Sequence, residues 1–224
     1  MAQIDLSSAN LGRVAGQEVD ALMIANTLVW ESPSGPDGPY YVNDALAITP
    51  NLYSDGTPNI VIGHQLLFHN PGFVTGIRWY DGTSAAGSWT LSLWRSETID
   101  GHIPDLGTTP RLAVKTVAAA GGGYRDTLFD TPITVVTNKV YTVSRYNSIG
   151  RYVHHAGFSG AHGAYSDADP VYVPSFNQNM SAVAPGWTGV YPYLFRVGAG
   201  DVVPQVQSSG SPYYGITPIF YKSL

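Results

Sequence analysis

Histidines and aspartates gather in one stretch of the chain, where they could form a metal site. The set consists of His154, His155, His162, Asp167 and Asp169. Imidazole and carboxylate groups are common ligands of divalent ions. The spacing matches no standard ligand motif, and adjacent residues of a strand point to opposite faces, so His154 and His155 cannot both bind one ion in an unbroken strand. We therefore expect solvated loop histidines and no metal ion.

The segment 166–169, Ser-Asp-Ala-Asp, could offer two carboxylates to calcium. An adequate calcium site needs about six to eight oxygen ligands, and no further acidic residue lies nearby in the sequence. The same segment is typical of a turn in which a side-chain oxygen accepts a backbone hydrogen bond. We predict such a turn, leading into Pro170.

Hydrolytic chemistry has little support in the sequence. The 16 acidic residues are spread thinly, and none stands at the end of a recognisable strand with a partner for paired-carboxylate catalysis. The segment 157–160, Gly-Phe-Ser-Gly, lacks the Gly-x-Ser-x-Gly turn of serine hydrolases. We identify no catalytic residue, and we expect neither enzyme activity nor a cofactor.

Aromatic side chains are better candidates for ligand binding, because their rings combine apolar area with a polar group at small entropy cost. Three tryptophans, Trp79, Trp89 and Trp94, lie in strong strand patterns and are expected in the core. Segment 156–190 is long and rich in glycine and aromatic residues, and connections of this length are commonly functional. The candidates for stacking on sugar rings or packing across a subunit interface lie in or beside it: Tyr165, Tyr172, Trp187, Tyr191 and Tyr193.

These side chains have to be positioned by β-strands. Residues 73–80, Phe-Val-Thr-Gly-Ile-Arg-Trp-Tyr, alternate before Asp81-Gly82. The pattern predicts a strand that closes a hairpin, with Phe73, Thr75, Ile77 and Trp79 on one face.

Further strands are predicted at 89–94, 111–117, 140–146 and 213–221, with turn residues between them. Pro218 predicts a sheet edge or a bulge for the last of these. Such spacing in a chain of 224 residues favours one large all-β domain, an antiparallel β-sandwich of the jelly-roll type.

Composition excludes several classes of protein. The formal net charge is −5 and the 11 basic residues are scattered, so we expect no nucleic-acid partner. The chain has no cysteine, which excludes disulfides and thiolate metal sites. The first ten residues do not resemble a signal peptide, and no run of about 18 apolar residues occurs. We expect synthesis in a cytoplasm and no membrane insertion.

The chain before residue 40 differs from the rest. Residues 19–24 and 27–30 predict two short strands around Ala25-Asn26, and such a hairpin needs a partner surface because two strands bury little apolar area. Residues 31–39 contain three prolines and two glycines and predict a linker or surface loop. We expect an N-terminal hairpin segment at 1–30, a linker at 31–39 and the sandwich at 40–224.

A series of motifs resembles the DUF4082 family of jelly-roll-like domains. The family has a Val-Thr-Gly-Val-Arg-Phe-Tyr strand, a Ser-Leu-Trp strand, and a Thr-Tyr-x-Val-Ser-Tyr strand followed by Gly-Arg-Tyr. Corresponding residues lie here, in the same order, at 73–82, 89–94, 131–135, 140–146 and 150–152. The resemblance covers about residues 60–224. It implies carbohydrate or surface recognition, since the family occurs attached to extracellular and cell-envelope proteins, and it supplies no catalytic residues.

Residues 16–30 resemble the opening segment of minor tail proteins from phages of actinobacteria, in which a Val-x-x-Ile-x-x-Gly-x-x-x-Val-Trp pattern is common. Ala25 or Asn26 stands where glycine is usual. The two resemblances together imply a phage virion protein, made in the host cytoplasm, that displays its sandwich to a host-surface glycan. Attachment to other tail proteins would use the apolar residues of the hairpin: Val19, Leu22, Ile24, Val29 and Trp30.

Closed symmetric assembly, as a homotrimer, would cover the edge strands of such a protein. Two alternatives stay open. The chain could be a free carbohydrate-binding module, or a glycan-degrading enzyme of the cell envelope whose acid pair the sequence does not reveal.

Overall fold

The computed structural model describes residues 13–14, 17–18, 21–24, 27–31, 37–42, 51–54, 58–81, 87–95, 109–155, 165–174, 193–198, 200–207 and 214–223. Every helix or strand assigned within these ranges is a β-strand. None of the described residues belongs to a helix that could span a membrane.

The chain divides into two units, Met1–Asp37 with Leu224, and Gly38–Ser223. In the first unit β1 (Arg13–Val14) pairs with β2 (Gln17–Glu18). Strand β3 (Ala21–Ile24) forms an antiparallel hairpin with β4 (Thr27–Glu31), at the position of the two strands predicted there.

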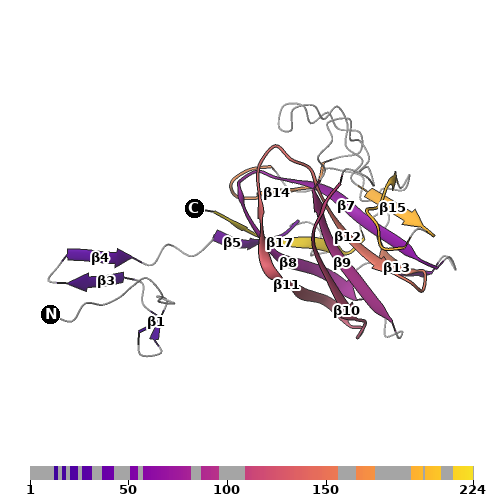
Figure 1. Ribbon diagram of the computed structural model, residues 1–224, viewed down its shortest axis with the longest axis horizontal. Coiled ribbons are helices and arrows are strands. Elements are labelled where there is room, and N and C mark those ends of the chain that lie inside the picture. The colour runs from indigo at the N-terminus through magenta and orange to yellow at the C-terminus, as the bar shows by residue number, and fades with distance from the viewer. Residues whose placement is uncertain are drawn as a thin grey trace. The chain divides into compact units, whose positions relative to one another are not determined.

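The second unit is built on two antiparallel sheets (Figure 1). The larger sheet has the order β10 (Arg111–Ala118), β9 (Ser88–Arg95), β12 (Tyr141–Asn147), β7 (Ile60–Phe68), β15 (Tyr193–Val197) and β16 (Val206–Gln207), and β14 (Val171–Tyr172) pairs with the end of β7. The smaller sheet has the order β11 (Gly123–Val135), β8 (Gly72–Asp81), β17 (Ile216–Lys222) and β5 (Asp37–Tyr40). A separate pair joins β13 (Arg151–His154) to β6 (Asn51–Ser54). The predicted all-β antiparallel sandwich is confirmed.

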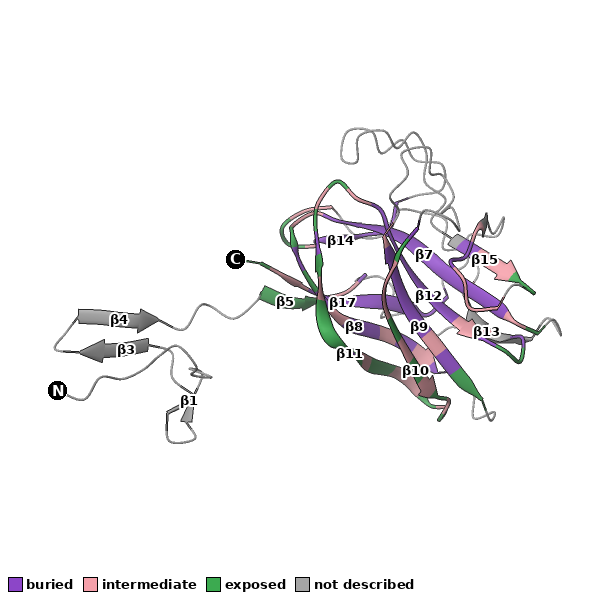
Figure 2. Cartoon of the chain, viewed as in Figure 1, coloured by how far each residue is buried: buried purple, intermediate pink, exposed green. Residues whose placement is uncertain are grey.

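The core lies between the two sheets, where each contributes one face of its strands. Figure 2 shows the contrast between the buried strand β7 and the largely exposed edge strand β11. The core side chains are mostly aliphatic and aromatic and include Ile62, Leu66, Phe68, Val74, Ile77, Trp79, Trp89, Leu91, Val143 and Phe220.

Strand β8 does not keep the predicted alternation. Phe73 is 38% exposed, whereas Ile77 and Trp79 are fully buried. Thr75 is half-buried and faces away from the core with Phe73. The prediction that Phe73, Thr75, Ile77 and Trp79 share one face is therefore wrong.

A β-bulge explains the change of face. Ile219 of β17 pairs with Gly76 of β8, yet the next residue, Phe220, pairs with Val74. One residue of β8, Thr75, is thus extra, and an extra residue moves every side chain after it to the opposite face.

Pro218 pairs with Ile77, one residue before Ile219, after which the register shifts, so the prediction of a bulge in this strand pair is confirmed near it. The other prediction, a sheet edge, is wrong because β17 lies between β8 and β5. Proline is tolerated near such an irregularity because the bulge already interrupts the hydrogen-bond ladder.

The three strand tryptophans are all buried, but on two different faces. Trp79 and Trp89 belong to the core between the sheets, as predicted. Trp94 is 6% exposed, lies on the other face of β9, and donates from Nε1 to Ser144 Oγ at 2.8 Å. Because Trp89 and Trp94 are five positions apart in one strand, an odd number, the two rings have to point to opposite faces.

Candidate functional site

Two turns meet at the end of the sandwich where β7 passes into β8. Residues His69, Asn70 and Pro71 connect these strands. The backbone N–H of His69 donates to the carbonyl oxygen of Pro170 at 2.8 Å, and Val171 of β14 pairs with the last residue of β7. This short pairing places segment 165–170 beside the β7–β8 turn.

Segment 166–169 forms a tight turn at the predicted position, and backbone hydrogen bonds close it. The backbone N–H of Ser166 donates to Asp169 at 3.3 Å, and that of Asp169 donates back at 3.1 Å. Asp167 and Ala168 form the tip. The preceding residue, Tyr165, has a φ of 47°, which is uncommon for an aromatic residue. Residues held in this conformation concentrate at functional sites.

The ring of Tyr165 is held between two other rings. It lies edge-on to His69, with 4.8 Å between centroids, and edge-on to Tyr172, at 5.6 Å. Tyr172 is only 7% exposed, whereas Tyr165 is half-buried, and burial raises the pKa of the Tyr165 phenol. The buried Tyr172 therefore packs against Tyr165 on the protein side, and Tyr165 presents part of its ring to solvent.

A charged carboxylate stands beside this ring. Asn70 Nδ2 donates to Asp167 Oδ1 at 2.7 Å, and His69 Nδ1 lies 3.5 Å from the same oxygen. The hydrogen bond from Asn70, helped by the nearby His69 and Lys222, lowers the pKa of Asp167. The Asp167 side chain is 80% exposed, so it presents an ionised acceptor to solvent.

The last strand, β17, contributes Lys222 to the same site. Lys222 Nζ donates to the carbonyl oxygen of Asp167 at 2.9 Å and lies 4.8 Å from the centroid of the Tyr40 ring. We call this set the turn cluster: His69, Asn70, Tyr165, Asp167, Tyr172 and Lys222.

The chemistry of the turn cluster suits a ligand rich in hydroxyl groups. A carboxylate accepts hydrogen bonds from hydroxyls, an imidazole can donate or accept, and a partly exposed ring offers apolar area to C–H groups. All of these groups are held by contacts within the protein before a ligand arrives, which lowers the entropy lost on binding. Within the described ranges, no three His, Asp or Glu side chains gather as metal ligands.

The structure brings two predicted ligand residues, Tyr165 and Tyr172, into contact. Tyr193 lies in β15 opposite His64, and only its backbone is described. Trp187 and Tyr191 lie outside the described residues. Of the predicted anchoring residues, Leu22 and Ile24 lie in β3 and Val29 and Trp30 in β4, with only their backbones described, whereas Val19 lies outside.

Of the residues first considered for a metal, His154 is the last residue of β13, so the prediction of a loop is wrong for it. Asp167 and Asp169 lie in the 166–169 turn, and His162 is outside the described ranges. The sequence reasoning missed His69, Asn70 and Lys222. The dipeptide Asn70-Pro71 is a turn signal, and together with the preceding His69 it could have indicated a turn that carries two polar side chains. Lys222 carried no such signal.

Comparison with solved structures gives matches of low identity. A clostridial cysteine protease, Cwp84 after propeptide cleavage, matches at 8% identity and a TM-score of 0.43, over 77% of this chain and 38% of that one. The cysteine protease and lectin-like domains of Cwp84, a surface-layer-associated protein of Clostridium difficile, match at 9% identity and a TM-score of 0.43, over 88% and 41%. The chain thus spans about two fifths of the length of either structure.

No curated protein matches the chain. A family profile does: DUF4082, described as a domain of unknown function, matches residues 47–214, which hold β6 to β16 and the turn cluster apart from Lys222. The chain therefore belongs to the DUF4082 family.

Proposed function

We propose that this chain is a non-enzymatic recognition protein that binds a host-surface glycan through the turn cluster. The observation that carries the proposal is the position of Tyr165, whose partly exposed ring is fixed by His69 and Tyr172 beside the ionised Asp167. A ring next to fixed hydrogen-bonding groups is what a sugar needs, because its C–H face is apolar and its hydroxyls are polar.

We further propose that the protein is a minor tail component of a phage virion, made in the host cytoplasm and assembled as a homotrimer. The support is the resemblance of residues 16–30 to tail-protein openings and the presence of the β3–β4 hairpin in a unit separate from the sandwich. In this proposal the apolar residues of the hairpin contact other tail proteins.

The glycan proposal is tested by retention of the intact chain on immobilised neutral polysaccharide from the host envelope. We expect Y165A and D167N each to weaken retention about tenfold, equivalent to about 1.4 kcal/mol. Y146A is the matched control, because Tyr146 is a half-buried, hydrogen-bonded tyrosine of the larger sheet. Retention of Y165A and D167N equal to that of the wild type, with unchanged thermal unfolding, would overturn the proposal.

The tail proposal is tested separately by deleting residues 1–36 from the gene in the phage. We expect virions that lack the protein, detected by mass spectrometry of purified particles. Normal incorporation of the shortened chain would overturn attachment through this segment.

A further inference from the structure

We propose that the outer face of the smaller sheet is a second contact surface, which binds an extended, neutral oligosaccharide that begins at the turn cluster. This inference rests on the proposed glycan function and deepens it. The surface, which we call the tyrosine face, consists of Tyr41, Arg78, Tyr80, Tyr124, Asp126 and Tyr221.

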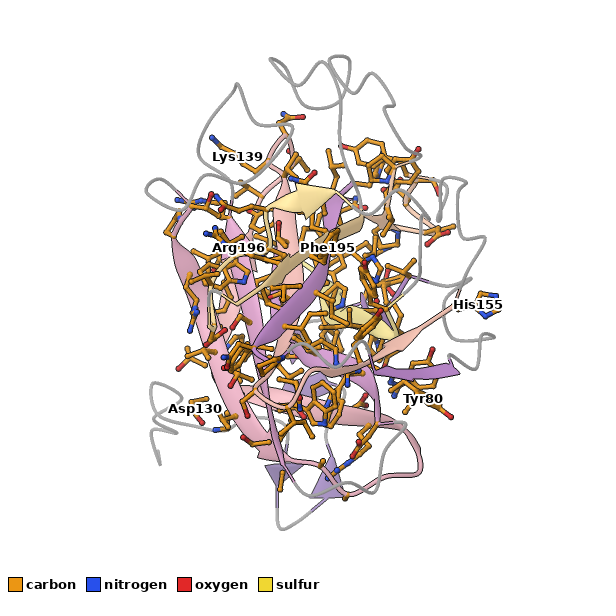
Figure 3. The ribbon with its side chains drawn as sticks, turned by 90° about the vertical axis from the view of Figure 1, so that its right-hand side faces the viewer. Tyr80, Asp130, Lys139, His155, Phe195 and Arg196 are labelled. Carbon is orange, nitrogen blue, oxygen red and sulfur yellow. The ribbon has the colours of Figure 1, made fainter. Side chains whose placement is uncertain are left out.

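Strand register brings these residues to one face. Tyr80 of β8 pairs with Tyr124 of β11, and Arg78 pairs with Asp126 two positions earlier. The rings of Tyr80 and Tyr124 meet edge-on with 5.2 Å between centroids. Trp79, next to Tyr80 in β8, points into the core, so alternation places both tyrosines on the outer face, where each is half-buried, and Figure 3 shows Tyr80 at the periphery of the sandwich.

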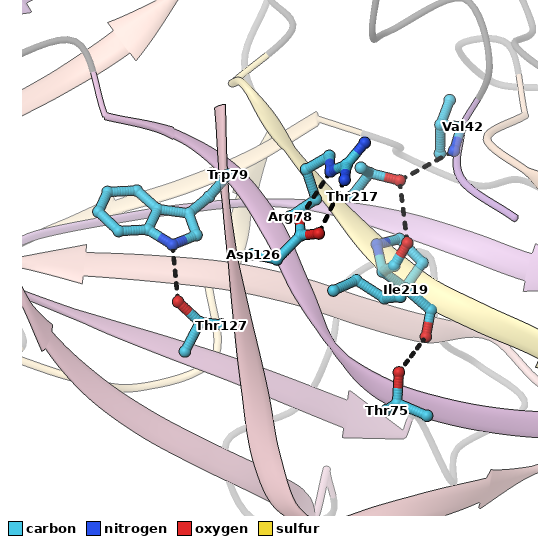
Figure 4. Close-up of polar contacts among 9 residues, drawn as sticks. Val42, Thr75, Arg78, Trp79, Asp126, Thr127, Thr217 and Ile219 are labelled. Carbon is cyan, nitrogen blue, oxygen red and sulfur yellow. Dashed lines mark hydrogen bonds and ion pairs between the residues drawn. The ribbon is translucent and has the colours of Figure 1, made fainter. Parts of the chain in front are cut away.

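The centre of the tyrosine face is a paired charge. Arg78 Nε donates to Asp126 Oδ1 at 2.6 Å and Arg78 Nη2 donates to Oδ2 at 2.7 Å (Figure 4). The hydrogen bond with Asp126 raises the pKa of Arg78, so the guanidinium stays charged. Because the fork neutralises both groups, the face presents polar atoms without net charge, which favours a neutral ligand over an acidic one.

Tyr41 is fixed over this fork. The backbone N–H of Val42 donates to Thr217 Oγ1 at 2.9 Å, which ties this segment to β17 (Figure 4). The ring of Tyr41 lies 4.2 Å from the guanidinium carbon of Arg78, and burial raises the pKa of its phenol. A tyrosine held by a stacked guanidinium is a rigid platform and loses little entropy when a ligand binds.

The tyrosine face and the turn cluster meet at the end of β17. Tyr221 pairs with the exposed Phe73 at the start of β8, whereas the next residue, Lys222, points to the opposite face of the strand and donates to the backbone carbonyl oxygen of Asp167. From Phe73 to Tyr80 a strand extends roughly 23 Å at about 3.3 Å per residue, enough for several sugar rings. The β-bulge at Thr75 makes this possible, since it lets Phe73 share the outer face with Arg78 and Tyr80.

Chain length of the ligand provides the test. The intact protein is titrated with neutral glucan, mannan, galactan and arabinan oligosaccharides of one to six sugars. We expect affinity to rise at least tenfold from disaccharide to hexasaccharide for the series that binds, and the Y80A/Y124A variant to lose that gain while disaccharide binding stays unchanged. Y165A is expected to weaken binding at every length, and Y146A to behave as the wild type.

The outcomes separate the two proposals. A gain with length that persists in Y80A/Y124A overturns the tyrosine face alone, whereas normal binding by Y165A overturns the turn cluster. Binding of no oligosaccharide by the wild type overturns both. A change of molar mass in Y80A/Y124A, measured by light scattering without ligand, would assign the face to contact between copies of the chain and overturn the inference. If Y80A/Y124A unfolds, D126N replaces it, with the same expected loss of the length-dependent gain.

Discussion

The guanidinium carbon of Arg145 lies 3.7 Å from the centroid of the Trp89 ring, and both side chains are buried between the two sheets. Trp79 faces the same guanidinium from the smaller sheet at 5.4 Å. Arg145 Nη1 also donates to the carbonyl oxygen of Tyr80 at 2.8 Å, which fixes the strand that carries the tyrosine face. The cation thus joins the two sheets through a ring from each.

Substitution of Arg145 tests this link. We expect R145A to lower the free energy of unfolding by about 3 kcal/mol, because it leaves a cavity between two tryptophans and removes a buried hydrogen bond. K115A is the control, since Lys115 is paired with Asp130 at the surface and should lose less than about 1 kcal/mol. Urea unfolding measures both, and equal losses would contradict the account.

The close approach of β8 to β11 at Gly76, beside the β-bulge, leads to a second prediction. A Cβ atom at Gly76 would lie 2.3 Å from the carbonyl oxygen of Thr127, a backbone atom that cannot move without breaking the β8–β11 ladder. We expect G76A to lower the stability by about 3 kcal/mol. At Gly122 a Cβ meets nothing within 4 Å, and G122A should lose only the smaller backbone strain of its φ of 98°. Thermal unfolding that ranks the two variants in the opposite order would contradict the close approach at Gly76.

Asp201 makes a prediction about pH. Burial raises its pKa, although Arg111 donates to Oδ2 at 2.8 Å and opposes the shift. The folded protein therefore holds this proton more tightly than the unfolded chain, and the resulting stabilisation is complete below the unfolded pKa of about 3.9 and is lost as pH rises through the folded pKa. D201N cannot ionise, so its stability relative to the wild type should increase between about pH 4 and pH 7 in urea titrations. A constant difference over this range would contradict the shift.

The pKa of Asp167 is shifted in the opposite direction to that of Asp201, and its effect on stability has the opposite pH dependence. Its pKa is lowered, chiefly by the hydrogen bond from Asn70, so its contribution to the docked turn is present above about pH 3.9 and is lost as pH falls through the folded pKa. Carboxyl ¹³C titration by NMR should find a higher Asp167 pKa in N70A than in the wild type. H69A should also raise this pKa, because His69 lowers it through its charge and a hydrogen bond. An Asp167 pKa unchanged in N70A would contradict the hydrogen bond.

Strand alternation predicted β8, β9, β10, β12 and β17 because each carries a run of apolar or aromatic residues with turn signals at its ends. The first part of β11 was missed because it begins in a Gly triplet and its edge position leaves Arg125 and Asp126 exposed, so it lacks an apolar face. The bulge at Thr75 could not be predicted, because residues 73–80 alternate in the sequence as they would in a strand without an extra residue.

The candidate site was only half predictable. Tyr165 and Tyr172 stood out as aromatic residues in a long connection. Their partners did not, because Asn70 and Asp167 are 97 residues apart and only the pairing of β14 with β7 brings them together. Tyr80 and Arg78 were seen as strand residues, but their joint face with Tyr41 depends on the β5–β17 side of the sheet, which local sequence does not encode.

The most direct test of the central claim is a backbone amide NMR titration of the intact protein with the neutral oligosaccharide that it retains best. The account predicts shift changes at residues 69–70 and 165–169, with further changes at Tyr41, Arg78, Tyr80 and Tyr124 when the ligand is long enough. Shift changes confined to other parts of the sandwich, such as the outer face of β9 and β10, would contradict glycan recognition by the turn cluster.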